Sequence, residues 1–172
     1  MEHPRMTATE AQSKTLSLIH LINRPGAANL EEFIRKSNYL TTARCNGHHR
    51  HDYGLMFHSL EVLDTMLNSN LFGLPQESIV IVALCHDLGK ATLRGATLGH
   101  GGHPARSLYI LDRCGFQLTE TEREAIAHHH LGKHIKPFLS AVTNPLQQLL
   151  HLGDCVSTGL NKKGRPYVFK KI

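Results

Sequence analysis

The sequence predicts a single all-α domain built as a bundle of helices. Along most of the chain, apolar residues recur at intervals of three and four, which is the spacing of one face of a helix. The alternation that is typical of a half-buried strand occurs only at residues 167–169, where a short C-terminal strand or arm is expected. A length of 172 residues is enough for one domain with a substantial core.

The N-terminal part of the chain predicts two helices and a connection. A helix is expected over residues 9–23, and a Pro-Gly pair then stops it. Asn29 is the expected N-cap of a second, short helix that continues to Lys36. Residues 37–52 lack helical periodicity and are rich in polar side chains, so we expect an irregular connection there.

The strongest helical patterns lie in the middle of the chain. Residues 55–71 carry apolar side chains at helical spacing and predict a long helix. Seven consecutive apolar residues then end at Cys85 and predict a buried helix, with Gly89 as its expected left-handed C-cap. His86 and Asp87 follow in the last turn of this helix. Side chains at a helix end can lean toward one point beyond it, so an imidazole and a carboxylate are expected to meet there.

The C-terminal half predicts a glycine-rich loop and three more helices. The loop covers residues 93–102 and lacks the G-x-x-x-x-G-K-[ST] order of a phosphate-binding P-loop. A His-Pro pair opens a helix over residues 103–114. A capping-box pattern starts the next helix, which we expect to run from residue 119 to about residue 132. Residues 146–158 predict the last helix, and Asp154 lies among its apolar residues.

The net charge of +5 is confined to the C-terminus. It equals the five basic residues that follow Asp154, because the 14 other basic residues match the 14 acidic residues in number. Such an arm binds nucleic acid or an anionic substrate in some proteins, and in others it is simply a solvated terminus. Its basic residues are Lys162, Lys163, Arg165, Lys170 and Lys171.

The cysteines and the N-terminus point to the cytoplasm. The four cysteines contain no C-x-x-C pair, and a disulfide framework is not expected at this size. The first residues lack the basic and then apolar pattern of a secretory signal, and no segment is long and apolar enough to span a bilayer. A cytoplasmic protein without a membrane partner is therefore expected.

Histidines are concentrated where the helices are predicted. Of the 14 histidines, 12 lie between His48 and His151. Imidazole is the commonest protein ligand for transition metals, so a folded metal site is expected. The histidines and aspartates that fall on apolar faces or helix ends are, in chain order, His58, His86, Asp87, His103, His129 and Asp154.

This order resembles the H…HD…H…H…D pattern of the HD superfamily of metal-dependent phosphohydrolases. Residues 55–62, LMFHSLEV, are similar to the family's G-L-x-x-H-S-L-E-V, and residues 83–90, ALCHDLGK, are similar to its A-L-L-H-D-[IL]-G-K. Residues 102–107, 124–129 and 149–154 resemble the segments G-H-x-x-x-S, A-I-x-x-H and L-L-H-x-A-D of a bacterial and phage branch. The match runs from about residue 48 to residue 158.

The resemblance is incomplete in one loop, and it does not decide the identity of two of the expected metal ligands. The family segment H-x-Y-x-G-G-L aligns with residues 49–55, where Tyr53 replaces the first glycine and His51 replaces the tyrosine. His100 competes with His103 for the third histidine, and the following proline and serine favour His103. His128 competes with His129 for the fourth.

The resemblance implies a dinuclear metal centre within an HD domain of residues 41–160, preceded by N-terminal helices over residues 1–40 and followed by the basic arm over residues 161–172. The first metal is expected on His58, His86, Asp87 and Asp154. The second is expected on His103 and His129, with Asp87 bridging both ions. These donors suit Mn, Fe, Co, Ni or Zn, and Mg is a further option.

The resemblance also implies a phosphohydrolase that cleaves a phosphate mono- or diester with a metal-bridging hydroxide. Asp87 and Lys90 are the expected catalytic residues. Lys90 either contacts a phosphate oxygen or pairs with the site's own carboxylates, and His49 and Arg106 are further candidates for phosphate contact. A nucleotide or a short nucleic acid is the expected substrate. The alternatives are a di-iron oxygenase of the same superfamily and a non-catalytic module that binds nucleic acid or another ligand.

Overall fold

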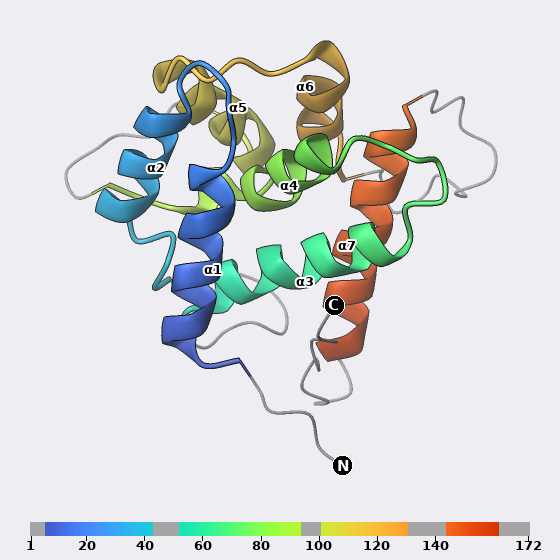
Figure 1. Cartoon of the computed structure of the whole chain (residues 1–172), viewed down its shortest axis with the longest axis horizontal. Coiled ribbons are helices and arrows are strands. Elements are labelled where there is room, and N and C mark those ends of the chain that lie inside the picture. The colour runs from blue at the N-terminus through green and yellow to red at the C-terminus, as the bar shows by residue number, and fades with distance from the viewer. Residues whose placement is uncertain (1–5, 43–51, 94–100, 131–143, 162–172) are drawn as a thin grey trace.

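The computed structural model describes residues 6–42, 52–93, 101–130 and 144–161, with side chains up to residue 158. Within these ranges the regular elements are seven α-helices and one short 3-10 helix, without a strand (Figure 1). The predicted all-α class is confirmed. The expected strand at residues 167–169, the basic arm, His49 and His100 lie outside the described residues.

The first two helices pack against each other at one side of the molecule (Figure 1). Helix α1 (Ala8–His20) begins with a capping box, and α2 (Ala27–Lys36) follows a tight turn. The prediction that Asn29 caps α2 is wrong, because Gly26 occupies that position with φ of 83°. Glycine adopts this left-handed conformation at little cost, so the turn ends at Gly26 and α2 begins earlier than expected. Asn29 lies inside the helix, and its amide donates to the carbonyl of Cys114.

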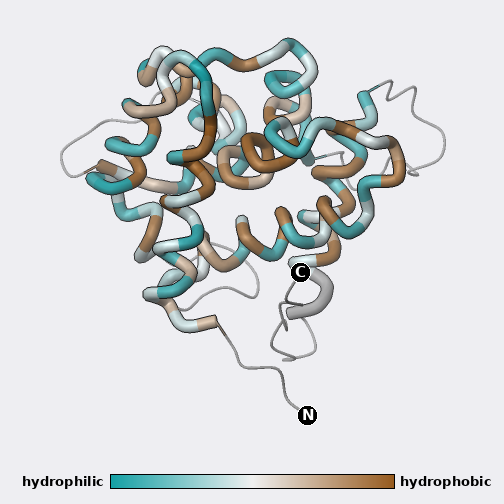
Figure 2. The backbone as a smooth tube through the Cα atoms, viewed as in Figure 1, coloured by the Kyte–Doolittle hydropathy of each residue, from teal (hydrophilic) through white to brown (hydrophobic). Residues whose placement is uncertain are grey.

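The core of the molecule is formed around α3 (Gly54–Asn68) and α4 (Gln76–Cys85), which pack against each other. Both helices are buried along most of their length, and α4 is the apolar run that the sequence marks as an interior helix. Figure 2 shows the central α4 as mostly hydrophobic, whereas hydrophobic and hydrophilic segments alternate along the helices around it. Helix α7 (Pro145–Asn161) packs along α3 and also contacts α4.

The turn before α3 contains one departure from the family pattern. Tyr53 precedes the helix with φ of 68°, in the left-handed region where a residue with a Cβ is strained. The family pattern has glycine at this position, which is the residue that the conformation favours. This chain therefore places a tyrosine in a conformation that favours glycine.

After α4 the chain makes a tight turn instead of the glycine cap that the sequence predicts. The 3-10 helix η1 (Leu88–Lys90) follows directly, and Gly89 is absent from the residues with positive φ. The prediction of a left-handed cap is wrong, and the glycine is needed for a different reason. A Cβ on Gly89 would lie 2.2 Å from the carbonyl oxygen of His103, so only glycine lets α5 (His103–Arg113) approach the turn this closely.

Helix α6 (Glu120–Ala127) begins with the predicted capping box of Thr119 but ends earlier than expected. It was expected to continue through His130, whereas the helix stops at Ala127. Consecutive residues of a helix point about 100° apart, so a continuing helix would turn neighbouring histidines away from each other. The early end lets His129 and His130 approach the same place.

The N-terminal helices are tied to the rest of the fold through Arg24. Its guanidinium lies 2.6 Å from the buried carboxylate of Glu122 at the start of α6 and 2.8 Å from Glu77 at the start of α4. A buried carboxylate needs such a partner, and the guanidinium holds the pKa of Glu122 below its usual value although burial acts in the opposite direction.

In the part of the chain that the structure describes, no helix has the length and apolar character to cross a bilayer.

Candidate metal centre

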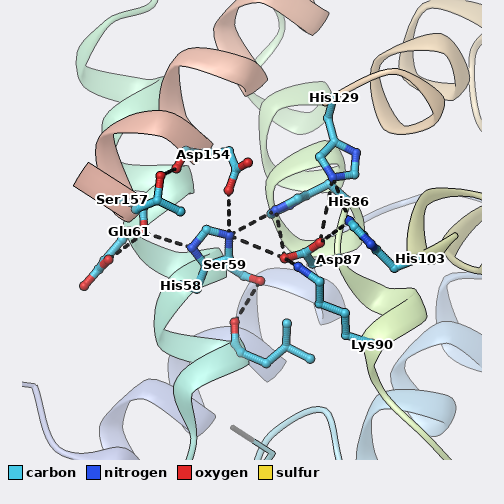
Figure 3. A network of polar contacts seen from close by, with 12 residues as sticks. His58, Ser59, Glu61, His86, Asp87, Lys90, His103, His129, Asp154 and Ser157 are labelled. Carbon is cyan, nitrogen blue, oxygen red and sulfur yellow. Dashed lines mark hydrogen bonds and ion pairs between the residues drawn. The ribbon is translucent and has the colours of Figure 1, made fainter. Parts of the chain in front are cut away.

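The predicted ligands of the first metal come together from three helices. His58 lies on α3, His86 and Asp87 lie at the end of α4, and Asp154 lies on α7 (Figure 3). His58 Nε2 is 3.1 Å from Asp154 Oδ1 and 3.5 Å from Asp87 Oδ2. The Nε2 atoms of His58 and His86 are 3.3 Å apart. These four side chains are buried and form one compact group, which we call the first cluster.

The predicted ligands of the second metal meet on the other side of Asp87. His103 is the first residue of α5, and its Nε2 lies 3.2 Å from Asp87 Oδ1. His129 Nε2 lies 3.8 Å from the same oxygen and 3.3 Å from His103 Nε2. Asp87 therefore directs Oδ2 toward the first cluster and Oδ1 toward these histidines, as a bridging carboxylate would (Figure 3).

His130 joins the second group although the sequence did not single it out. Its Nε2 lies 2.8 Å from His103 Nε2, and its Nδ1 lies 3.8 Å from Asp154 Oδ2. We call His103, His129 and His130 the second cluster, whose ligand atoms all lie within 4.8 Å of one another. His128, the alternative to His129, has an exposed side chain, while its carbonyl accepts from Gln147. The structure therefore favours His129 over His128.

Backbone carbonyls fix the orientation of two of the rings. His86 Nδ1 lies 2.9 Å from the carbonyl of Ala83, and His129 Nδ1 lies 2.8 Å from the carbonyl of Ile126. A carbonyl only accepts hydrogen bonds, so Nδ1 of each ring carries the hydrogen. In a neutral ring Nε2 then presents a lone pair, and in both cases Nε2 faces the cluster.

A hydroxyl and a carboxylate orient His58 in the same way. Ser157 on α7 donates its hydroxyl hydrogen to Glu61, and its oxygen lies 2.9 Å from His58 Nδ1. Because that hydrogen is already used, the oxygen accepts the Nδ1 hydrogen of His58. In a neutral ring, Nε2 of His58 then carries a lone pair, which faces the carboxylate of Asp154. Metal-binding histidines are commonly held through their other nitrogen by such partners.

These contacts place acceptors against acceptors, and a bound cation would relieve the repulsion. Lone pairs of His58, His86 and the two carboxylates face one another at 3.1 to 3.5 Å. Ligands bound to a transition metal at about 2.0–2.2 Å lie roughly 3.0–3.6 Å from each other. The donor set and its spacing therefore fit a divalent cation in the first cluster, and the Asp87 Oδ1, His103 and His129 distances fit a second.

The histidines of the second cluster have pKa values that suit metal binding. Burial lowers the pKa of His129 to about 3 and that of His103 to about 4, although Asp87 acts in the opposite direction. Burial also lowers the pKa of His130. Since a metal binds the neutral imidazole, these rings are ready to bind at neutral pH without losing a proton.

Two basic residues border the clusters. Lys90 Nζ lies 2.5 Å from Asp87 Oδ2, which is the ion pair that the sequence left open as an alternative to phosphate contact. Arg106 donates through Nε to the carbonyl of Gly89 and through a terminal nitrogen to that of Gly101. Arg106 therefore holds the turn of residues 86–90, which we call the HD turn, against α5, and its contact with phosphate stays a prediction.

Some functional side chains had only weak signals in the sequence. Glu61 belongs to the H-S-L-E-V motif, but the motif does not reveal that its partner is Ser157 on a helix about a hundred residues later. Ser107 belongs to the G-H-x-x-x-S motif, accepts from the backbone of Gly89 and donates to the carbonyl of His86. It therefore fixes the HD turn to the helix that begins with a predicted ligand.

Comparison with known proteins gives one family. The family model described as HD domain matches residues 55–159, which include every residue of both clusters. No curated protein and no solved structure matches the chain.

Proposed function

Because the chain belongs to the HD domain family, a superfamily of metal-dependent hydrolases, we propose that it hydrolyses a phosphate mono- or diester with two divalent cations. A nucleotide or a short nucleic acid is the proposed substrate. The observation that carries this proposal is the position of Asp87, whose two carboxylate oxygens face two separate groups of histidines. A single structural ion would not require a carboxylate shared in this way.

When bound, a pair of divalent cations supplies Lewis acidity for in-line displacement at phosphorus. The protein's own contribution is to hold the donors in place before the ions arrive. His58, His86 and His129 are each held by a hydrogen bond from Nδ1, so the lone pairs on Nε2 need little rearrangement.

The two clusters differ in access, which suggests where the substrate enters. His58, His86 and His129 are buried, whereas the side chains of His103 and His130 are 21% and 50% exposed. A phosphate ester can therefore reach the centre from the side of the second cluster. Lys90 is partly buried beside Asp87, and its positive charge attracts a phosphate oxygen that approaches Asp87.

The test is metal analysis followed by activity. Purified protein is stripped with a chelator and reloaded separately with Mn, Fe, Co, Ni, Zn or Mg. Each form is then assayed with bis-p-nitrophenyl phosphate, p-nitrophenyl phosphate and a panel of nucleotides and short oligonucleotides. We expect about two ions per chain and hydrolysis that depends on the metal.

Two other outcomes would replace the proposal. Iron with a mixed-valent spectrum and no phosphatase activity would indicate the di-iron oxygenase. Salt-sensitive binding of nucleic acid that persists after metal removal, without hydrolysis, would indicate a binding module that uses the basic arm.

A further inference from the structure

We propose that His130 is a ligand of the second cation, so that the second site has three imidazoles and the shared carboxylate of Asp87. This inference rests on the proposed dinuclear function and concerns the composition of one of its two sites. Its starting point is the position of His130, whose Nε2 lies closer to His103 Nε2 than any other pair of imidazole nitrogens in the described clusters.

The backbone brings His130 to the site. Helix α6 ends at Ala127, and the next residues leave the helical path, so that two consecutive histidines approach the same place. The ring centroids of His129 and His130 are 4.2 Å apart, and those of His103 and His130 are 4.8 Å apart. Two consecutive residues in a regular helix would point about 100° apart. The early end of α6 therefore has a direct effect on the donor set.

The charges around His130 fit a role as a ligand. Its Nε2 faces the second cluster, while its Nδ1 lies 3.8 Å from Asp154 Oδ2 of the first cluster. A neutral ring that carries its hydrogen on Nδ1 would direct that hydrogen toward the carboxylate and the lone pair on Nε2 toward the second cation. The ring would then link the two sites, as the carboxylate of Asp87 does.

A third imidazole makes the two sites chemically unequal. The first cluster offers two imidazoles and two carboxylates, whereas the second would offer three imidazoles and one carboxylate oxygen. Imidazole suits Fe, Co, Ni and Zn, whereas carboxylate-rich sites suit Mg and Mn. The second site should therefore discriminate more strongly against Mn and Mg than the first.

The competing explanation is a hydrogen bond. One proton shared between His130 Nε2 and His103 Nε2 would also bring these atoms to 2.8 Å. His130 would then only orient His103, and its removal would leave both ions bound with nearly unchanged affinity.

The experiment measures metal binding directly. Chelator-treated wild-type protein, His130→Ala and His128→Ala are titrated calorimetrically with Ni(II) and with Mn(II), and bound metal is counted after dialysis. His128 is a matched control, because it is an exposed histidine two residues away whose side chain lies outside both clusters. Circular dichroism checks that each variant is folded, which we expect because both side chains are exposed.

We expect two Ni(II) ions in the wild type and in His128→Ala. In His130→Ala, one ion should remain at wild-type affinity and the second should bind at least about 10-fold more weakly. A further variant, His130→Asp, should restore the second ion while lowering the ratio of Ni(II) to Mn(II) affinity at that site.

The outcomes separate this inference from the proposed function. Two ions within about twofold of wild-type affinity in His130→Ala would overturn the inference and leave the dinuclear hydrolase standing. Loss of both ions from the folded variant would overturn the assignment of His130 to the second site. Absence of metal from the wild type would overturn the proposed function itself.

Discussion

The two clusters on either side of Asp87 are built in different ways. The first uses residues within or directly after long buried helices, and a hydroxyl and a carboxylate on two of those helices hold His58 in place. The second uses the first residue of α5 and the residues that follow α6, and part of it is exposed. The comparison distinguishes a buried first cluster from a partly exposed second cluster, and the proposed substrate and second cation would enter from the exposed side.

The variant with the largest expected effect is Asp87→Asn, which should weaken metal binding at both clusters. It keeps the shape of the side chain but removes the charge that both clusters share. We expect loss of both ions and a fall in kcat/KM of roughly 10³-fold, because both cations lose their common ligand. The measurements are bound metal per chain and initial rates on bis-p-nitrophenyl phosphate.

The matched control for Asp87→Asn is Asp112→Asn. Asp112 is an exposed aspartate near the end of α5 that pairs with Arg123 and belongs to neither cluster. Its metal content and rates should equal those of the wild type. Two tightly bound ions in folded Asp87→Asn would count against the bridging role.

Gly89→Ala should disturb the relative position of the two clusters. Its Cβ would lie 2.2 Å from the carbonyl of His103 and 2.7 Å from Arg106 Cβ, so α5 must move away from the HD turn. We expect a loss of about 1–3 kcal/mol in the free energy of unfolding and weaker binding of the second ion. Urea unfolding of the metal-free protein gives the first quantity, and calorimetry gives the second.

Gly102→Ala is the control for Gly89→Ala. A Cβ there would lie 3.5 Å from Pro104 Cδ, an ordinary contact, and φ is −67°. Gly102 is the N-cap of α5, where alanine is less favourable than glycine, so the free energy of unfolding should fall by about 0.5–1 kcal/mol, less than for Gly89→Ala. Equal destabilisation by both substitutions would show that close packing of α5 is not the cause.

Ser157→Ala should affect the first cluster alone. It removes the hydroxyl between His58 and Glu61, so the ring loses the partner that fixes its Nδ1 hydrogen. We expect first-site affinity to fall by about 10–100-fold while second-site affinity is unchanged. Titration with Mn(II), followed by the electron paramagnetic resonance of the free ion, separates the two sites.

Thr158→Ala provides the control for Ser157→Ala on the same helix. The Thr158 hydroxyl donates to carbonyls of its own helix, so its loss should leave both metal affinities within about twofold of wild type. A Ser157→Ala protein with unchanged first-site affinity would argue that His58 needs no fixed orientation.

The last prediction concerns stability, which should depend on pH in the metal-free protein. The pKa values of His129 and His103 are lowered to about 3 and about 4, so below pH 6.5 the unfolded chain binds more protons than the folded one. Stability should therefore fall as the pH is lowered from about 7.5 to about 5. The urea midpoint should depend less on pH in His129→Gln than in the wild type across this range. Identical pH profiles of the two proteins would contradict the attribution of the effect to His129.

The sequence was sufficient for the parts of the site that local patterns determine. The apolar run of α4 and the doublet His86-Asp87 define a buried helix that ends at the centre, and the structure places them there. The capping box at Thr119 and the His-Pro start of α5 are likewise local signals, and both helices begin as predicted.

The sequence was insufficient where tertiary contact decides the outcome. Gly89 has the expected sequence signal for a C-cap, but its actual constraint is the backbone of α5, which lies nearby only after folding. The place of His130 depends on where α6 stops, and helix ends are set by packing as much as by local propensity. Ser157 contacts His58 although the two residues are 99 positions apart in the sequence, and no local pattern can reveal such a contact.

Helix α7 contributes both Asp154 and Ser157 to the first cluster, and it is the last described helix along the chain. Since a polypeptide is made from its N-terminus, His58 and the HD turn leave the ribosome before the helix that completes their binding site. The proposed first cation would therefore meet its complete set of donors only after α7 has docked.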